Sequence, residues 1–221
     1  MTKARHIPPP YTPPPAEALK ILHLDEALVV VDKPSGLLSV PGIGPEKAFC
    51  AQSIIRDHFG DALIVHRLDM DTSGIMVIAR TKFAQRSISK LFEQRQTYKT
   101  YIALVEGLVE QDFGTIDKAI AKYSLNRPLR HLDDEGQEAI TEWQVIERDE
   151  NANQTRLELS PKTGRSHQLR LHLQSIGHPI LGDAFYGNPS NAQRLCLHAS
   201  CLSFAHPVTL AEIEIRSPAP F

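Results

Sequence analysis

The chain has 221 residues, a formal net charge of −2 and a hydrophobic fraction of 42%. That fraction allows a substantial core, and the absence of any run of about 18 apolar residues argues against a membrane span. The N-terminal sequence MTKARHIPPPYTPPP lacks the apolar centre of a secretory signal. The three cysteines have no CxxC spacing, which argues against disulfides and against a zinc site. We therefore expect a soluble, cytoplasmic protein with reduced thiols.

Residues 1–18 are rich in proline, which favours an extended polyproline conformation over a packed element. We predict a flexible leader here, with a docking peptide as the alternative. The globular domain is expected over residues 19–221.

In the first part of this domain, apolar runs alternate with short polar or turn-forming segments. A strand is predicted over 28–31, where four apolar residues precede a proline and a glycine. A short helix is predicted over 51–59. The polar segment HRLDMDTSG, residues 66–74, separates two apolar runs, so we expect a loop that leads into a strand over 75–79.

From Lys82 the spacing of the apolar residues becomes helical. One face of an amphipathic helix is formed by Ala84, Ile88, Leu91 and Phe92. Thr81 stands in the N-cap position of this helix.

The rest of the chain is mostly β-prone. Strands are predicted over 98–106, 139–145, 155–159, 195–204 and 211–215, and a helix over 166–176. Strands dominate and the alternation of strand and helix is irregular. The pattern therefore predicts an α+β fold with a large, mostly antiparallel mixed sheet flanked by helices and loops.

Charge is distributed unevenly along the chain. Residues 80–101 carry six basic side chains and one acid, whereas residues 133–150 carry eight acids and one arginine. A near-neutral molecule of this kind can hold a polyanion on one face. A solvated helix face is the alternative.

Asp69 is the first candidate for chemistry. If its segment enters the loop extended, Arg67 and Asp69 project to the same side, because strand side chains alternate. An arginine beside an aspartate favours the ionised carboxylate, which suits a nucleophile or a base. The alternative is an ordinary ion pair that fixes a loop.

A second cluster, KTGRSHQLR, contains the turn that opens the helix predicted over 166–176. Helix N-termini attract anions, so Arg165 is a candidate phosphate contact. Arg170, a turn further on, is placed to reach a carboxylate across a cleft, unless the helix is simply a basic surface helix. Tyr101 offers a flat face on which a base can stack, with a core or edge tyrosine as the alternative.

No cofactor or metal site is predicted. His167 and His172 are five residues apart and so point in different directions on a helix. The chain has no HExxH motif, no Walker A sequence, no Rossmann fingerprint and no GxSxG elbow.

Several motifs, in the expected order, resemble the RluA family of pseudouridine synthases. HRLDMDTSG followed by IMVIART is similar to the family's signature loop. The other segments are DKPSGLLSVPG (opening strand and turn), YKTYIALVEG (tyrosine strand), PKTGRSHQLRLHL (arginine motif), and GHPILGDAFYG and LCLHASCLSF (C-terminal signatures). The resemblance covers roughly residue 21 to the C-terminus. It is greatest to short members without an S4 domain, and the segment LNRP at 125–128 is similar to the member with dual specificity for a 23S rRNA hairpin loop and tRNA anticodon loops.

The resemblance implies a pseudouridine synthase catalytic domain with a central RNA-binding cleft. It implies that Asp69 is catalytic, that Arg170 pairs with it and that Tyr101 stacks on the base. Arg67 matches the arginine that helps to displace the target base, and Arg165 is assigned to a phosphate contact. RNA is the expected partner and a monomer the expected state.

Two other functions are compatible with parts of the sequence. The first is a non-catalytic RNA-binding or folding module of the same fold, although Asp69, Tyr101 and Arg170 are all present. The second is a hydrolase that uses Asp69 with a histidine such as His66, although no third orienting group or metal spacing accompanies it.

Overall fold

The computed structural model describes residues 10–123 and 129–221. Its strands are β1 (Lys20–Leu24), β2 (Leu28–Lys33), β3 (Leu63–Ile64), β4 (Ser73–Ala79), β5 (Tyr98–Glu106), β6 (Phe113–Asp117), β7 (Ile120–Lys122), β8 (Arg130–Leu132), β9 (Ile140–Asp149), β10 (Gln154–Pro161), β11 (Leu197–Ala205) and β12 (Glu212–Arg216). Its helices are α1 (Ala51–Phe59), α2 (Lys82–Glu93) and α3 (Gln168–Ser175), with 3₁₀ turns at Ala16–Ala18 and Pro45–Lys47. The segment LNRP lies outside the described residues.

One large sheet organises the described part of the chain. Ten strands pair in the order β1-β2-β4-β11-β5-β10-β9-β6, with β12 on β11 and β3 on β4, while β7 and β8 form a separate pair. Every pairing in the sheet is antiparallel except that of β4 with β11. The prediction of an α+β fold with a mostly antiparallel mixed sheet is confirmed.

The helices begin and end where local chemistry allows. The Thr81 side chain accepts a hydrogen bond from the backbone N–H of Ala84, so α2 has the predicted N-cap. Helix α3 is shorter than the predicted 166–176, because His167 adopts a left-handed backbone (φ 59°) and interrupts the helical turn. At the other end Gly177 (φ 86°) terminates the helix.

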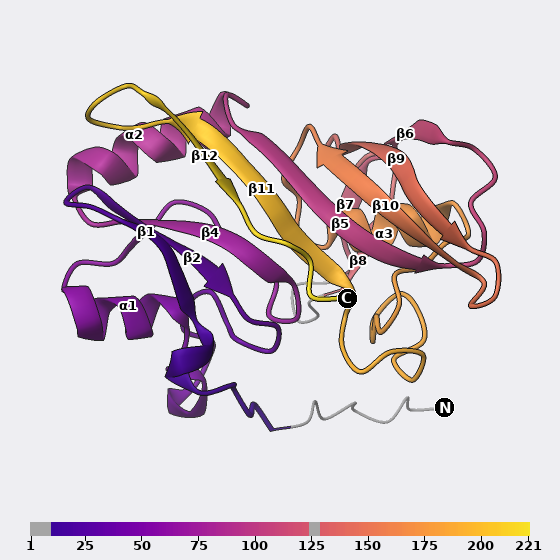
Figure 1. The fold of residues 1–221 in the computed structure, drawn as a ribbon, viewed down its shortest axis with the longest axis horizontal. Coiled ribbons are helices and arrows are strands. Elements are labelled where there is room, and N and C mark those ends of the chain that lie inside the picture. Colours follow the sequence, from indigo (N-terminus) through magenta and orange to yellow (C-terminus); the bar gives the residue numbers. More distant parts are fainter. Residues whose placement is uncertain (1–9, 124–128) are drawn as a thin grey trace.

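The two faces of the sheet pack against different helices, because successive strand residues point to opposite faces. Val29 and Val31 of β2 pack in a cluster with α1, whereas Val30 packs in another with Ile88 of α2. Figure 1 shows α1 and α2 beside the N-terminal half of the sheet and α3 beside the other half.

Tyr101 marks the junction between the two halves. It packs against the cluster under α1 and also against the cluster formed by α3 with β5 and β10. Helices α1 and α3 therefore cover the same face of the sheet. The loop between β3 and β4 reaches this junction, and so does the start of α3.

The packed chain extends further toward the N-terminus than Leu19, where the sequence placed its start. The hydroxyl of Tyr11 donates to the carbonyl of Phe49 and accepts from the N–H of Leu38. Residues 1–9 lie outside the described part, so a flexible leader there stays a prediction. None of the described helices has the length and hydropathy needed to cross a membrane.

Gly74 allows the one parallel pairing of the sheet. Its backbone has φ 112°, and a Cβ atom there would lie 2.3 Å from the carbonyl oxygen of Ala199 on β11. Only glycine satisfies both the left-handed backbone and the close approach of the two strands.

We predict that Gly74→Ala destabilises the protein by roughly 2–5 kcal/mol, from backbone strain and a clash with the main chain of β11. Urea denaturation at equilibrium measures this change. Gly164→Ala is the matched control, since a Cβ atom there meets nothing within 4 Å. Equal stability of the two variants would contradict the proposed constraint at Gly74.

Candidate active site

The side chains of Lys33 and Ser39 hold the loop that carries Asp69 through hydrogen bonds to its main chain. The ammonium of Lys33 donates to the carbonyl of Met70 at 2.9 Å, and also to those of Pro34 and Leu37. The hydroxyl of Ser39 donates to the carbonyl of Leu68 and accepts from the N–H of the same residue. Both residues flanking Asp69 are therefore fixed, and its side chain is free to face the site.

Lys33 is fully buried, which is unusual for a lysine. Burial lowers the pKa of Lys33 to about 7, and the nearby carboxylates of Asp71 and Asp69 act in the opposite direction. Its three carbonyl partners match the three N–H donors of an ammonium.

Arg170 is held in place by Asp183. The Nε atom of Arg170 lies 2.8 Å from Oδ2 of Asp183 and the Nη2 atom lies 2.6 Å from Oδ1, which makes a bidentate pair. Oδ1 also accepts from the backbone N–H groups of Phe185 and Tyr186. Burial alone would raise the pKa of Asp183, but these hydrogen bonds and the charge of Arg170 outweigh it and lower the pKa.

The third nitrogen of Arg170 faces Asp69. Nη1 lies 3.5 Å from Oδ2 of Asp69, and the Arg170 side chain is only 3% exposed, compared with 28% for Asp69. The guanidinium also lies over the rings of Phe185 and Tyr186. A buried and rigid cation is thus presented to a carboxylate that solvent or substrate can reach.

Tyr101 lines the same recess as Asp69. Burial raises the pKa of the Tyr101 hydroxyl, and the charge of Asp69 adds to the effect. The phenol is therefore neutral at physiological pH. Its position on β5 places a flat ring beside the carboxylate.

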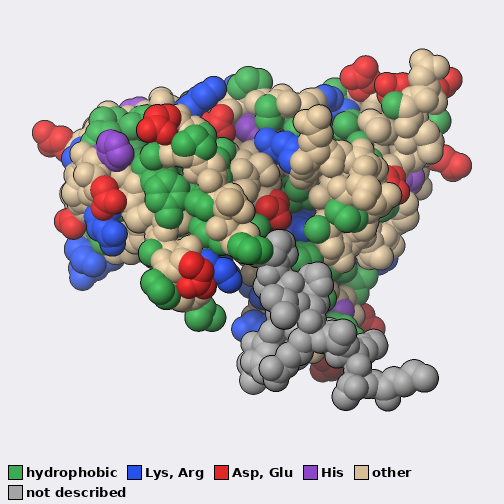
Figure 2. All heavy atoms as spheres, turned by 90° about the horizontal axis from the view of Figure 1, so that it is seen from below, with side chains coloured by type: hydrophobic (Ala, Val, Ile, Leu, Met, Phe, Trp, Pro, Cys, Tyr) green, Lys and Arg blue, Asp and Glu red, His purple; other side chains and the backbone are tan. Residues whose placement is uncertain are grey.

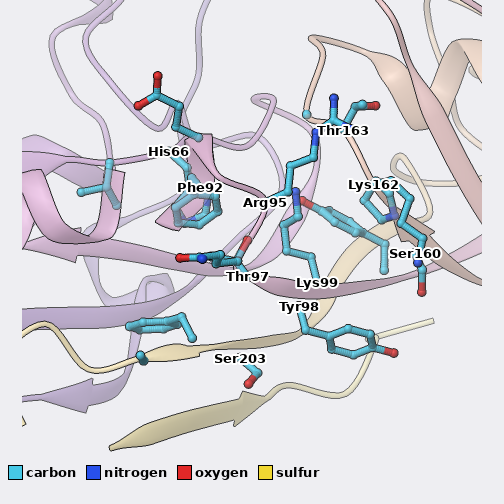
Figure 3. Close-up of a pocket in the computed structure, with 18 of the residues that line it drawn as sticks. His66, Phe92, Arg95, Thr97, Tyr98, Lys99, Ser160, Lys162, Thr163 and Ser203 are labelled. Carbon is cyan, nitrogen blue, oxygen red and sulfur yellow. The ribbon is translucent and has the colours of Figure 1, made fainter. Parts of the chain in front are cut away.

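The recess opens into a larger groove. The recess measures about 130 Å³ and the groove about 1070 Å³. Both are lined by Arg67, Lys99, Tyr101 and Arg165. Figure 3 shows Arg95 and Lys99 side by side in the groove, with Lys162 and Thr163 across from them.

Arg67 and Arg165 lie where a substrate can reach them. Arg67 is exposed and lines both cavities. Arg67 forms no ion pair with Asp69 among the described residues, because residues 65–72 form an irregular loop rather than an extended segment, and the pair is made by Arg170, as the family resemblance implies. The Nε atom of Arg165 donates to the carbonyl of Glu138, which leaves part of its guanidinium for another partner.

Two basic side chains of the groove form ion pairs with residues of the acidic segment 133–150. Arg95 forms an ion pair with Glu138 at 2.6 Å, and Lys162 pairs with Glu142 at 2.7 Å. Figure 2, seen from below, shows basic and acidic side chains interspersed on one face of the molecule. The separation of the charges in the sequence had suggested two distinct faces. In the structure, basic and acidic side chains instead lie next to each other.

Asp183, Lys33 and His167 were not predicted as site residues. Asp183 and Lys33 stand in the segments GHPILGDAFYG and DKPSGLLSVPG, which carried the family resemblance. That resemblance was a signal for both residues, but the contact of Lys33 with Met70 joins residues 37 positions apart, and that of Asp183 with Arg170 joins residues 13 positions apart.

The arrangement argues against the hydrolase alternative. The Nε2 atom of His66 accepts a hydrogen bond from the N–H of Val77, and its ring stacks on Phe92. Burial lowers the pKa of His66 to about 3. Nε2 of His66 is thus occupied by the backbone, and among the described residues His66 forms no ion pair with Asp69. Among the described residues no group of three or more histidine, cysteine or acidic side chains is arranged to hold a metal ion.

Comparisons with known proteins identify the family of the chain. Residues 27–175 match the family model for RNA pseudouridylate synthase. The chain is 46% identical over 215 residues to the dual-specificity RNA pseudouridine synthase RluA of Haemophilus influenzae, and 42% identical to that of Escherichia coli strain K12. Each alignment covers 96% of this chain and 98% of the relative.

Solved structures give the same result. Human RNA pseudouridylate synthase domain containing 1 matches with a TM-score of 0.79 at 30% identity, covering 95% of this chain and 87% of the human one. Human RNA pseudouridylate synthase domain containing 4 matches with a TM-score of 0.72 at 27% identity, over 93% and 91% of the two chains. The chain belongs to the RNA pseudouridylate synthase family, and is an enzyme that isomerises uridine in RNA to pseudouridine.

Proposed function

We propose that this enzyme uses Asp69 as its catalytic carboxylate and acts on uridines in two RNA contexts, a 23S rRNA hairpin loop and tRNA anticodon stem-loops. The observation that carries the proposal is the position of Asp69, in a small recess beside Arg170 and Tyr101 that opens into a basic groove. Relatives of nearly equal length are named dual-specificity enzymes, which supports two substrates.

Substrate entry requires the target nucleotide to leave its stack. Flipping costs a few kcal/mol and is least costly in a loop, where stacking is already weakened. The flipped uracil would lie against the ring of Tyr101 in the recess. Arg67, exposed at the boundary between recess and groove, would take the place that the base vacates.

The reaction is an isomerisation, so the nucleotide has the same atoms and the same oxidation state before and after it. The bond between the sugar and N1 of uracil breaks, the base turns, and a bond forms between the sugar and C5. The proton of C5 leaves and N1 gains one. Asp69 either attacks the nucleotide or takes a proton from its sugar, and both routes use the ionised carboxylate.

Arg170 supports either route by its fixed position. A flexible cation would collapse onto Asp69 and neutralise it, whereas Asp183 keeps two of the nitrogens of Arg170 occupied. The remaining nitrogen stands at 3.5 Å from Asp69, close enough to orient the carboxylate. Arg165 would contact a phosphate of the bound RNA.

We predict that Asp69→Asn lowers the initial rate of pseudouridine formation by on the order of 10³-fold or more, because the amide cannot act as nucleophile or base. Tritium release from RNA labelled at uridine C5 measures the rate, with an anticodon stem-loop and a 23S rRNA hairpin as separate substrates. RNA affinity should change little.

Asp61→Asn is the matched control, since Asp61 is exposed and lines neither the groove nor the recess. Turnover by Asp69→Asn at the rate of this control would exclude Asp69 as the catalytic group. Release from one RNA only would narrow the substrate, and tight binding of both without release by the wild type would favour a non-catalytic binding module.

We also predict that RNA binding weakens steeply with salt. With about four phosphate contacts and roughly 0.7 counterions released at each, a fourfold rise in salt lowers the affinity by on the order of 50-fold. In a plot of the logarithm of affinity against the logarithm of salt concentration, Lys99→Ala should reduce the slope by the amount expected of about one phosphate contact. The control is Lys20→Ala, on β1 outside the groove. An affinity that does not change with salt would contradict the role of the groove.

A further inference from the structure

His167 is a second neighbour of Asp69 that the proposed mechanism does not use. Its Nε2 atom lies 3.9 Å from Oδ2 of Asp69, and its side chain is only 10% exposed. We infer that His167 is a positioning residue for Asp69, and that its Nε2–H group holds Oδ2 when RNA closes the site. The inference rests on the proposed role of Asp69.

The backbone of His167 is strained in a way that points its side chain into the site. The residue has φ 59° and ψ 15°, a left-handed conformation that is unfavourable for a residue other than glycine. Strain of this kind persists where the surrounding structure imposes it, and it clusters at functional sites. Here the carbonyl of His167 accepts from the N–H of Leu171 in the first turn of α3.

The ring of His167 is fixed on its remaining sides. It stacks on Phe185 with the ring centroids 5.5 Å apart, and it meets Tyr186 edge to face. The Nδ1 atom lies 2.9 Å from the hydroxyl of Tyr186. The ring therefore has little freedom to turn away from Asp69.

The hydroxyl of Tyr186 can donate to His167, which is compatible with a proton on Nε2. This oxygen accepts a hydrogen bond from the backbone N–H of Arg130, so its single hydrogen is free for Nδ1 of His167. An Nδ1 that accepts leaves the proton of a neutral imidazole on Nε2. The other tautomer would direct the lone pair of Nε2 at a carboxylate, which is repulsive.

The charge state agrees with this geometry. Burial lowers the pKa of His167, the carboxylates of Asp69 and Asp183 oppose the effect, and the guanidiniums of Arg170 and Arg130 add to it. The imidazole is therefore neutral at pH 7. A neutral donor orients Asp69 without cancelling the negative charge that the reaction needs.

Both neighbours of Asp69 act on the same oxygen. Arg170 and His167 each approach Oδ2, and within the described residues Oδ1 accepts no hydrogen bond. One oxygen is thus held and the other is left for the nucleotide. Hydrogen bonds at active sites are often long without substrate and shorten in the complex.

The test compares His167→Phe with His167→Gln in the full chain. Phenylalanine keeps the packing on Phe185 but has no N–H, whereas the amide of glutamine can still donate to Asp69. We expect the single-turnover rate of tritium release to fall roughly 10- to 100-fold in His167→Phe. In His167→Gln it should remain within about fivefold of the wild type, with the RNA affinity of both variants unchanged.

A wild-type rate in His167→Phe would overturn the inference. The inference would also fail if His167→Gln were as slow as His167→Phe while both variants remained folded and bound RNA. Packing would then be the only role of the ring. If His167→Phe does not fold, Tyr186→Phe decides, since it removes the hydroxyl that binds Nδ1 of His167 together with its contact to the N–H of Arg130. A several-fold slower rate supports the inference and an unchanged rate overturns it. Absence of release by the wild type itself would instead overturn the proposed function, and the inference with it.

Discussion

A buried guanidinium shared between two carboxylates is the constraint on which the site depends. Removing a charge from water costs several kcal/mol unless it is paired and hydrogen-bonded, and Asp183 provides that pairing for Arg170 through two parallel hydrogen bonds. Because Asp183 is itself held by backbone N–H groups, the guanidinium is fixed before any substrate arrives. Asp69 can therefore stand next to a permanent cation and still remain partly open to solvent.

The sheet brings these groups together from distant parts of the chain. Asp69 comes from the loop before β4, Arg170 from α3 and Asp183 from the segment after α3. The parallel pairing of β4 with β11, permitted by Gly74, joins the half of the molecule that carries Asp69 to the half that carries Arg170. Tyr101 lies at that junction, which explains how one tyrosine is both a core residue and part of the site. The packing of the two halves and the geometry of the site thus depend on the same contacts.

The sequence was informative where structure depends on local pattern. The helix over 51–59 and the strand over 98–106 were predicted with the bounds observed, because periodicity and flanking turn residues define them. Strand β6 was missed, since it is a short, mostly exposed edge strand without apolar alternation. In the site, the residues alone left an ion pair of Arg67 with Asp69 as an alternative, and the structure has Arg170 in that place. Asp183 was missed because a pairing with Arg170, 13 residues earlier, leaves no periodic trace in the sequence.

The most direct test of this account is the single-turnover rate of Arg170→Lys. A lysine keeps the positive charge, but its single ammonium cannot bind Asp183 at two points and face Asp69 at the same time. If the fixed fork positions Asp69, the rate of pseudouridine formation should fall by on the order of 100-fold, with RNA affinity retained. A rate close to that of the wild type would show that only the charge matters, and would contradict the arrangement described here.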